Sequence, residues 1–380
     1  MTQKEIEEQQ RKILFDHFKA GTLERKMDTA YKKKKPAKPA EPVPYDYQFD
    51  FKYLLGNYYK AYQNDKYYND KKARCAEVKE LEIGTEDDPI LLWYIYRKID
   101  NKNDEKNDEN EKNVRLFDCD SWNGSNDLMD EIYDRLWRNK MDKSLRDKFG
   151  GDTMNSFATT FHAFSGKKSD KDSFDDYKEK KDSYDALRKY AKLTGCLGNF
   201  VLVPKGFNDY RGLAGTIRDY WDLSLHELRC DRSGQGWLDL VDMPFNKYIN
   251  LFFLWDYVSG QKNEGYRARP LFKSHEAILT REKMVLPRKA GPPKEGGNDF
   301  SEFTKNANRC ILRRGAFMSA MLRISVECPH CYKRIVEYLA TDASLGSMED
   351  VIDQLQALPL GRKGRKAKGF LDDLLKELKN

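Results

Sequence analysis

T-G-C-L-G-N-F-V-L-V-P, residues 194–204, begins the most densely patterned part of this chain. G-F-N-D-Y-R-G follows at residues 206–212, then Y-W-D-L-S-L-H-E-L at 220–228 and Y-I-N-L-F-F-L-W-D-Y-V at 248–258. Apolar runs, glycines and polar residues recur together only here. The pattern predicts the structural centre of the fold, built from a strand, a polar turn and a buried helix.

Two elements are expected inside this central region. The apolar run Phe200–Val203 ends at Pro204, which is typical of a short strand. A helix is expected to start at Pro244, because proline is tolerated in the first turn, and to continue to Val258. Apolar residues on most of its sides predict a central core helix. One face would carry Phe245, Ile249, Phe252, Phe253 and Tyr257.

The flanking sequence predicts further helices and a few strands. Apolar residues at three- and four-residue spacing favour a long helix over 299–322 and shorter ones over 332–340 and 347–357. Further elements are expected upstream, namely helices over 124–148 and 177–193, strands over 45–53 and 114–120, and a buried strand or short helix over 88–99. The expected fold class is α+β, a mostly helical single core with a few short antiparallel strands.

Composition divides the chain into five segments. A charged helical arm and Pro/Lys linker is expected over 1–44, and a main α+β domain over 45–286 with polar insertions near 66–113 and 166–176. A linker loop at 287–298 leads to a C-terminal helical subdomain at 299–358 and a basic tail at 359–380.

The composition is that of a folded protein with a strongly charged surface. Charged residues make up 34% of the 380 residues and aromatic residues 13%, which excludes global disorder. The N-terminus has no secretory pattern, and no apolar run is long enough to span a bilayer. Seven cysteines in such a chain predict reduced thiols and a cytoplasmic location, with no membrane partner.

Two basic clusters indicate a nucleic-acid partner, because lysine and arginine bind phosphate backbones through counterion release. The clusters comprise Lys32, Lys33, Lys34, Lys35, Arg362, Lys363, Arg365, Lys366 and Lys368. A solvated linker and a solvated tail explain the same residues without any ligand.

C-P-H-C at residues 328–331 resembles the active-site motif of thioredoxin-fold disulfide oxidoreductases. A helix N-terminus and a nearby imidazole favour the thiolate form of a cysteine. Cys328, His330 and Cys331 are also weak candidates for a metal site, but a second pair of ligands is missing from the sequence. Ordinary thiols at the start of a helix are the third interpretation.

Other local patterns resemble nucleases. Arg269 and His275 have the spacing used by dimeric ribonucleases of the HEPN type, although Pro270 is awkward within a helix. The G-N-F-V-L-V-P segment, with Asn208, resembles the glycine–asparagine–apolar segment of HNH-type nucleases. The histidine motif of those enzymes is missing around His162, so a metal-ligand set cannot be assembled.

Three further polar residues have both structural and functional interpretations. His226 and Arg218 are catalytic candidates. A buried, hydrogen-bonded histidine is favoured for His226 because its neighbours are apolar, and a buried salt bridge explains Arg218 as well as catalysis does. Arg314 falls in the apolar stripe of the long helix, where a buried ion pair is favoured over a cleft-lining role. Nucleotide-binding glycine loops and the G-x-S-x-G motif of serine hydrolases are absent.

The order of pieces over residues 117–325 is similar to an uncharacterised bacterial family. The pieces include F-D-C-D-S, L-G-N-F-V-L-V-P, N-D-Y-R-G, F-F-L-W-D-Y-V and R-R-G-A-F-M. The resemblance implies a mostly helical core with a few strands, and implies no catalytic residues.

Binding of nucleic acid, or of a protein–nucleic acid complex, is the function that these patterns favour. The setting would be a bacterial cytoplasm, with phage defence or a mobile element as the biological context. A metal-dependent or HEPN-like phosphodiesterase and a protein-interaction subunit are the alternatives. No cofactor is expected, and the sequence is compatible with a homo-oligomer.

Overall fold

The computed structural model divides the chain into two compact units, residues 1–130 with 165–196, and residues 131–164 with 197–380. The residues that it describes are 132–137, 143–155, 185–186, 189–190, 193–194, 196–213, 220–231, 233–260, 265–280, 297–361 and 364–379. Nearly all of them belong to the second unit, to which the following description applies. The expected arm, the strands at 45–53 and 114–120, and the element at 88–99 lie outside the described residues.

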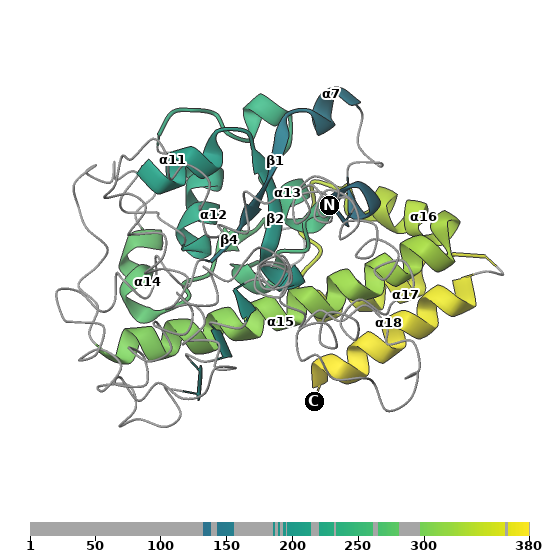
Figure 1. Ribbon diagram of the computed structural model, residues 1–380. Helices are drawn as coiled ribbons and strands as arrows, with labels where there is room; N and C mark the ends of the chain where they lie inside the picture. Colours follow the sequence, from purple (N-terminus) through teal and green to yellow (C-terminus); the bar gives the residue numbers. More distant parts are fainter. Residues whose placement is uncertain are drawn as a thin grey trace, which may run out of the picture. The chain divides into compact units, whose positions relative to one another are not determined.

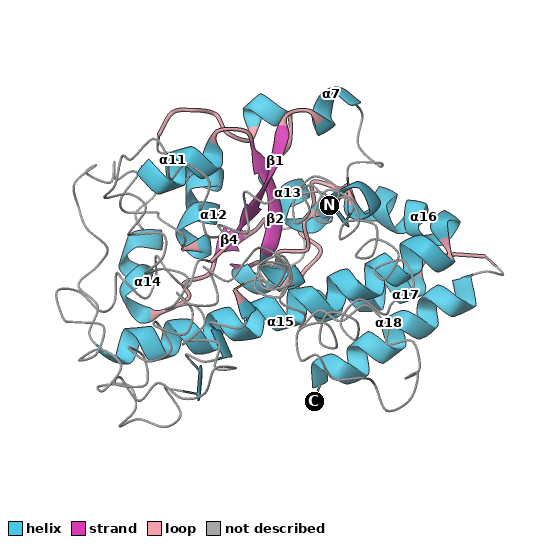
Figure 2. Ribbon diagram, in the orientation of Figure 1, coloured by secondary structure: helices cyan, strands magenta, loops and turns pink. Residues whose placement is uncertain are grey.

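The described part of the second unit is a mostly helical α+β structure with two antiparallel strand pairs (Figure 2). Strand β1 (Phe149–Thr153) pairs with β2 (Phe200–Pro204), with Phe149 opposite Pro204 and Thr153 opposite Phe200. Every residue of β2 is buried, as a continuous apolar run predicts. The strand predicted at this position is therefore confirmed. The second pair is β3 (Val258–Ser259) with β4 (Arg267–Ala268).

Helices surround these strands. In chain order the described elements are α7 (Lys143–Arg146), η2 (Leu197–Asn199), α11 (Phe207–Leu213), α12 (Trp221–Cys230), η3 (Asp239–Val241), α13 (Phe245–Leu251), η4 (Trp255–Tyr257), α14 (Lys273–Leu279), α15 (Gly297–Glu327), α16 (Pro329–Leu339), α17 (Met348–Ala357) and α18 (Gly364–Lys379). No helix within the described ranges combines the length and apolarity needed to cross a bilayer.

The long helix α15 runs through this unit and packs against several of its other elements (Figure 1). It contacts η2, η4, α16 and α18 along its 31 residues. The predicted apolar stripe is buried, including Phe303, Ala307, Cys310, Phe317 and Met321. The prediction of a long amphipathic helix is confirmed, and the helix extends beyond both predicted ends.

The predicted core helix over 244–258 is wrong in length, although its burial is confirmed. Helix α13 ends at Leu251, and Phe253 takes a left-handed φ of 59°. The Phe252 carbonyl accepts a hydrogen bond from Nε of Arg314 on α15, at 3.0 Å, instead of from a later helical N–H. The chain continues as η4 and β3. Pro244 is the N-cap residue of α13 rather than part of its first turn.

The segment expected as a basic tail contains helix α18. Its apolar face buries Ala367, Phe370, Leu371 and Leu374, and it contacts α15 and α17. The two shorter helices predicted before it are confirmed as α16 and α17. The C-terminal helices and the strand pairs thus belong to one compact unit.

Gly198 allows η2 to approach α15 closely. A Cβ atom at this position would lie 1.9 Å from the Ile311 carbonyl oxygen and 2.8 Å from the Gly315 nitrogen. Both neighbours are helix backbone, so they cannot rotate away as a side chain can. Glycine is therefore required by packing at this position.

We expect Gly198→Ala to lower the free energy of unfolding by about 3 kcal/mol, because the added methyl group overpacks a rigid contact. Urea denaturation followed by circular dichroism measures this difference. Gly150→Ala on β1 is the matched control, since no heavy atom lies within 4 Å of a Cβ placed there. Equal stability of the two variants would contradict this account of η2 packing.

Candidate functional site

The polar residues of the central region form a buried hydrogen-bonded frame. The fully buried side chain of Arg211 on α11 pairs with the carboxylate of Asp152 on β1. Its Nη2 donates to the Met154 carbonyl oxygen at 2.8 Å, and its guanidinium lies 5.1 Å from the ring centre of Trp221. This one side chain joins α11, the end of β1 and the start of α12.

A second part of this frame links two asparagines. The amide Nδ2 of Asn199 donates to the Asn155 carbonyl oxygen at 2.7 Å, and the backbone N–H of Asn155 donates to Oδ1 of Asn199 at 3.1 Å. The backbone N–H of Trp221 donates to Oδ1 of Asn155 at 3.3 Å. Asn199, within the segment that resembles HNH nucleases, therefore closes a turn in the core.

Arg314 has three backbone carbonyls as partners, not the ion pair favoured by the sequence. Its Nε donates to the carbonyl of Phe252 at 3.0 Å, and its Nη1 to those of Gly198 and Phe200 at 2.8 and 2.7 Å. Burial lowers the pKa of Arg314 to about 10, so the guanidinium stays charged at neutral pH. The expectation of an ion pair is corrected, because no described carboxylate pairs with Arg314. The side chain of Arg314 is fully buried, so it does not line a surface cleft.

Two of the catalytic candidates are buried histidines. Nδ1 of His275 on α14 lies 2.7 Å from Oδ2 of Asp222, and both side chains are fully buried. The same Oδ2 accepts the backbone N–H of Leu271 at 2.8 Å. Nε2 of His275 has no hydrogen-bond partner among the described residues. His226 is 4% exposed, with Nδ1 3.7 Å from Sγ of Cys230.

Among the described residues, neither Arg269 nor Asn208 forms a hydrogen bond or ion pair with the side chain of His275. Arg269 lies between β4 and α14, and its backbone N–H donates to the Tyr257 carbonyl at 2.9 Å. It therefore does not share a helix with His275, as the HEPN spacing would require. Asn208 is exposed on α11, while His162 and Arg218 lie outside the described residues. The buried histidines fit a structural role better than contact with a substrate.

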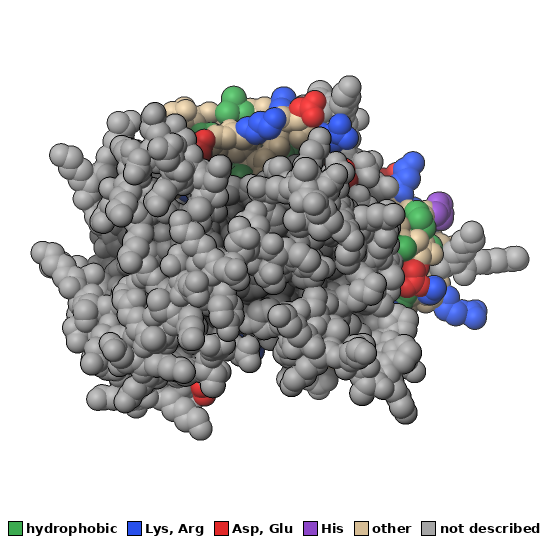
Figure 3. All heavy atoms as spheres, in the orientation of Figure 1, with side chains coloured by type: hydrophobic (Ala, Val, Ile, Leu, Met, Phe, Trp, Pro, Cys, Tyr) green, Lys and Arg blue, Asp and Glu red, His purple; other side chains and the backbone are tan. Residues whose placement is uncertain are grey.

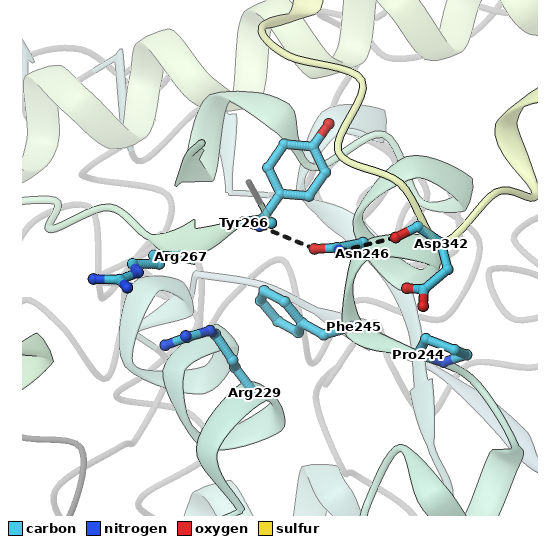
Figure 4. Close-up of a pocket in the computed structure, with 8 residues that line it drawn as sticks. Arg229, Pro244, Phe245, Asn246, Tyr266, Arg267 and Asp342 are labelled. Atoms are coloured by element: carbon cyan, nitrogen blue, oxygen red, sulfur yellow. Dashed lines mark hydrogen bonds between the residues drawn. The ribbon is translucent and has the colours of Figure 1, made fainter. Parts of the chain in front are cut away.

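A pocket of about 330 Å³ opens between α12, α13, β4 and the loop that follows α16. Two arginines line it, Arg229 of α12 and Arg267 of β4, and in Figure 4 their guanidinium groups lie on the same side. The ring of Phe245 lies between Arg229 and Tyr266, and Asp342 lies at the opposite end. The pocket thus has a cationic side, an aromatic wall and an acidic end.

Asn246 holds the walls of this pocket together. Its Oδ1 accepts the backbone N–H of Tyr266 at 2.9 Å, and its Nδ2 donates to the Asp342 carbonyl oxygen at 2.9 Å. The hydroxyl of buried Tyr266 donates to Oδ1 of Asn250 at 3.1 Å. The walls are therefore fixed before any ligand binds, which lowers the entropic cost of binding.

Sequence reasoning did not find this pocket. Basic residues beside an aromatic in G-Y-R-A-R-P, residues 265–270, were the available local signal. Arg229 has no such signal, because it lies on a separate helix.

The predicted basic clusters are described only in part. Arg365 and Lys366 are exposed and Lys368 is half-buried at the start of α18. Lys366 pairs with Glu327 of α15. Lys32, Lys33, Lys34, Lys35, Arg362 and Lys363 lie outside the described residues. Where described side chains are visible in Figure 3, basic and acidic groups are interspersed and do not form a continuous patch of one charge.

The cysteines differ from the expectation of uniformly reduced thiols. Cys328 and Cys331 form a disulfide, while Cys310 is a buried free thiol. A disulfide cannot supply thiolate ligands, so the structure gives no support to a metal site at Cys328, His330 and Cys331. The described ranges also lack any group of three His, Cys, Asp or Glu residues placed to hold a metal ion.

Comparisons of the chain with protein-family models, curated proteins and solved structures gave no match. The resemblances to an uncharacterised bacterial family and to the HNH segment therefore stay predictions. A functional proposal has to come from the geometry of the chain itself.

Proposed function

We propose that this protein binds single-stranded nucleic acid, with one nucleotide of the strand entering the pocket lined by Arg229, Arg267 and Phe245. The observation that carries the proposal is the placement of two guanidinium groups on one side of an aromatic wall. Arginine forms planar, charge-assisted hydrogen bonds with phosphate oxygens. Aromatic rings stack on bases of any sequence.

The dimensions and charges of the pocket agree with such a ligand. A volume of about 330 Å³ falls at the lower end of small-molecule sites. The phosphate would lie against Arg229 and Arg267, and the base against Phe245. Asp342, at the far end, offers an acceptor for an amino or hydroxyl group of the nucleotide.

The start of α18 offers a second contact. Arg365 and Lys366 are exposed there, and only Lys366 has a described carboxylate partner, Glu327. An exposed ion pair contributes little stability, so Lys366 can exchange Glu327 for a phosphate at small cost. The net charge of +6 favours approach of a polyanion.

We expect the double variant Arg229→Ala/Arg267→Ala to bind labelled single strands about 100-fold more weakly at about 50 mM salt, because two charge-assisted bonds of about 1.5 kcal/mol are lost. The slope of log affinity against log salt should fall by about 1.4, the contribution of two phosphate contacts to a single strand. Fluorescence anisotropy with labelled DNA and RNA oligonucleotides measures both quantities.

Matched variants separate the contributions. Lys148→Ala/Lys376→Ala removes the same charge from segments that do not line the pocket, so affinity should change less than about threefold. Phe245→Leu should weaken binding about tenfold without altering the salt slope, because stacking releases no counterions. No binding to any single strand at low salt would overturn the proposal. Unchanged binding by the double arginine variant would remove the pocket from it.

Incubation of the same oligonucleotides with Mg²⁺, Mn²⁺ or Zn²⁺ tests the phosphodiesterase alternative. Intact strands after prolonged incubation agree with a binding role. Cleavage that is lost in His275→Ala or His226→Ala would replace the binding proposal with a catalytic one.

A further inference from the structure

The turn between α15 and α16 contains a disulfide that plays no part in the proposed nucleic-acid binding. Cys328 is the N-cap residue of α16, Pro329 is its first residue and Cys331 its third. The two cysteines are joined, with their Cα atoms 5.4 Å apart. They are three residues apart, so the disulfide closes only a very small loop and limits the unfolded chain little. Its contribution to stability alone is therefore a weak reason for its presence.

The two sulfur-bearing residues differ in their access to solvent. Cys331 is fully buried, whereas Cys328 keeps 5% of its surface exposed. Exposed residues lie on both sides of Cys328 in the sequence, Glu327 before it and Pro329 and His330 after it. Both cysteines are buried, but these exposed neighbours place Cys328 nearer to the surface, so an external thiol reaches it with less rearrangement than it needs to reach Cys331.

The electrostatic surroundings favour a thiolate at Cys328. Helix α16 has eleven residues and no acidic residue in its first turn, so its unpaired N–H groups present partial positive charge to the N-cap. Exposed His330, two residues after Cys328, adds an imidazole that can donate a hydrogen bond. The nearest acidic neighbour in sequence, Glu327, has its carboxylate paired with Lys366.

The surrounding structure does not depend on the S–S bond. The backbone N–H of Cys328 donates to the Ile324 carbonyl at 2.8 Å, and the N–H of Tyr332 donates to the Cys328 carbonyl at 3.0 Å. The Tyr332 hydroxyl bonds to the Leu136 carbonyl, and Ile335 and Leu339 are fully buried. Helix α16 therefore stays docked when the disulfide opens.

We propose that Cys328 and Cys331 form a reversible redox site that exchanges electrons with low-molecular-weight thiols and disulfides of the glutathione class. In reduction, an external thiolate attacks Sγ of Cys328, and the Cys328–Cys331 bond breaks. Sγ of Cys331 leaves with the electron pair and takes up a proton. A second external thiolate attacks the mixed disulfide, which releases the external disulfide and a Cys328 thiolate. Two thiols are oxidised for each protein disulfide reduced.

Cys310 provides an internal reference for an unreactive thiol. It is fully enclosed, and burial raises the pKa of its thiol, so it stays unreactive in the folded protein. Cys230 is unsuitable as a reference for an ordinary thiol, because His226 Nδ1 and Arg229 Nη1 lie 3.7 and 3.9 Å from its sulfur.

The full-length protein is equilibrated in mixtures of reduced and oxidised glutathione at pH 7, alkylated with N-ethylmaleimide and analysed by peptide mass spectrometry. We expect Cys328 and Cys331 to become alkylated together in a two-electron transition, with unchanged circular dichroism. Restoring the oxidised mixture should close the disulfide again. A disulfide that survives a thousandfold excess of reduced over oxidised glutathione, or opens only in urea, would overturn the proposal.

Two variants test the mechanism. In Cys331→Ser the Cys328 thiol should react with N-ethylmaleimide at pH 7 about tenfold faster in the folded protein than in the same protein unfolded in urea, because its thiolate fraction is larger in the folded state. His330→Ala, a surface change that leaves both cysteines in place, should slow reduction of the wild-type disulfide and alkylation of Cys328. Reaction of Cys328 no faster in the folded than in the unfolded protein would refute the role of the helix N-terminus.

Discussion

Asp152→Asn should lower the free energy of unfolding by about 4 kcal/mol, the largest effect expected of any single substitution here. The carboxylate of Asp152 is the described acidic partner of Arg211, whose side chain is fully buried. An asparagine removes the negative charge that Asp152 places against the buried guanidinium, while the bond to the Met154 carbonyl remains. Urea denaturation at neutral pH measures the loss.

Two comparisons make this prediction specific. Asp147→Asn also removes one carboxylate, but its contact with Arg146 is exposed and 3.9 Å long, so the change should stay below about 0.5 kcal/mol. Arg211→Met combined with Asp152→Asn should be more stable than the sum of the single losses predicts, because the two groups share one interaction. Additive losses would show that the pair does not act as a unit.

Arg314→Met should cost about 3 kcal/mol. The carbonyls of Gly198, Phe200 and Phe252 would each lose a buried donor, at about 1–3 kcal/mol per unsatisfied group. Removal of a buried charge offsets part of this loss, which is why the expected value lies at the lower end of the sum. Thermal and urea unfolding of the variant measure the net effect.

Arg314→Lys separates geometry from charge. Lysine keeps the positive charge but lacks the planar fork that bonds three carbonyls from one position. A loss similar to that of Arg314→Met is expected. Full stability of the lysine variant would show that charge alone holds these carbonyls, and full stability of the methionine variant would show that the three bonds contribute nothing net.

Periodic and apolar patterns were sufficient for much of the secondary structure. The stripe through Phe303, Cys310 and Phe317 predicted α15, and the apolar run before Pro204 predicted β2. The core helix over 244–258 was predicted too long, because apolar residues on every side indicate burial but not backbone conformation. Arg314, far along the chain, takes the Phe252 carbonyl, and the helix has already ended at Leu251.

Polar residues were harder to interpret from sequence. His275 and Arg269 looked like a catalytic pair because of their spacing, yet the partner of His275 is Asp222, 53 residues away. The favoured ion pair of Arg314 proved to be a set of backbone carbonyls. The spacing of two residues in the sequence predicts a contact only when both lie on the same helix or strand. A polar side chain can bond to any group that tertiary packing brings within hydrogen-bonding distance, including groups far away in the sequence.

Local sequence was enough to predict a helix-rich α+β fold, a central region whose described apolar residues are buried, and the C-P-H-C motif at the start of a helix. Tertiary structure alone decided that the polar residues of that region form a buried frame, and that Arg229, Phe245 and Arg267 line one pocket. It also decided that the two cysteines of the motif are buried and joined in a disulfide. Secondary structure follows from the periodicity of apolar residues within one segment. Which polar side chains are buried, and which residues meet in one pocket, depends on contacts between distant segments, and a local sequence pattern does not predict those contacts.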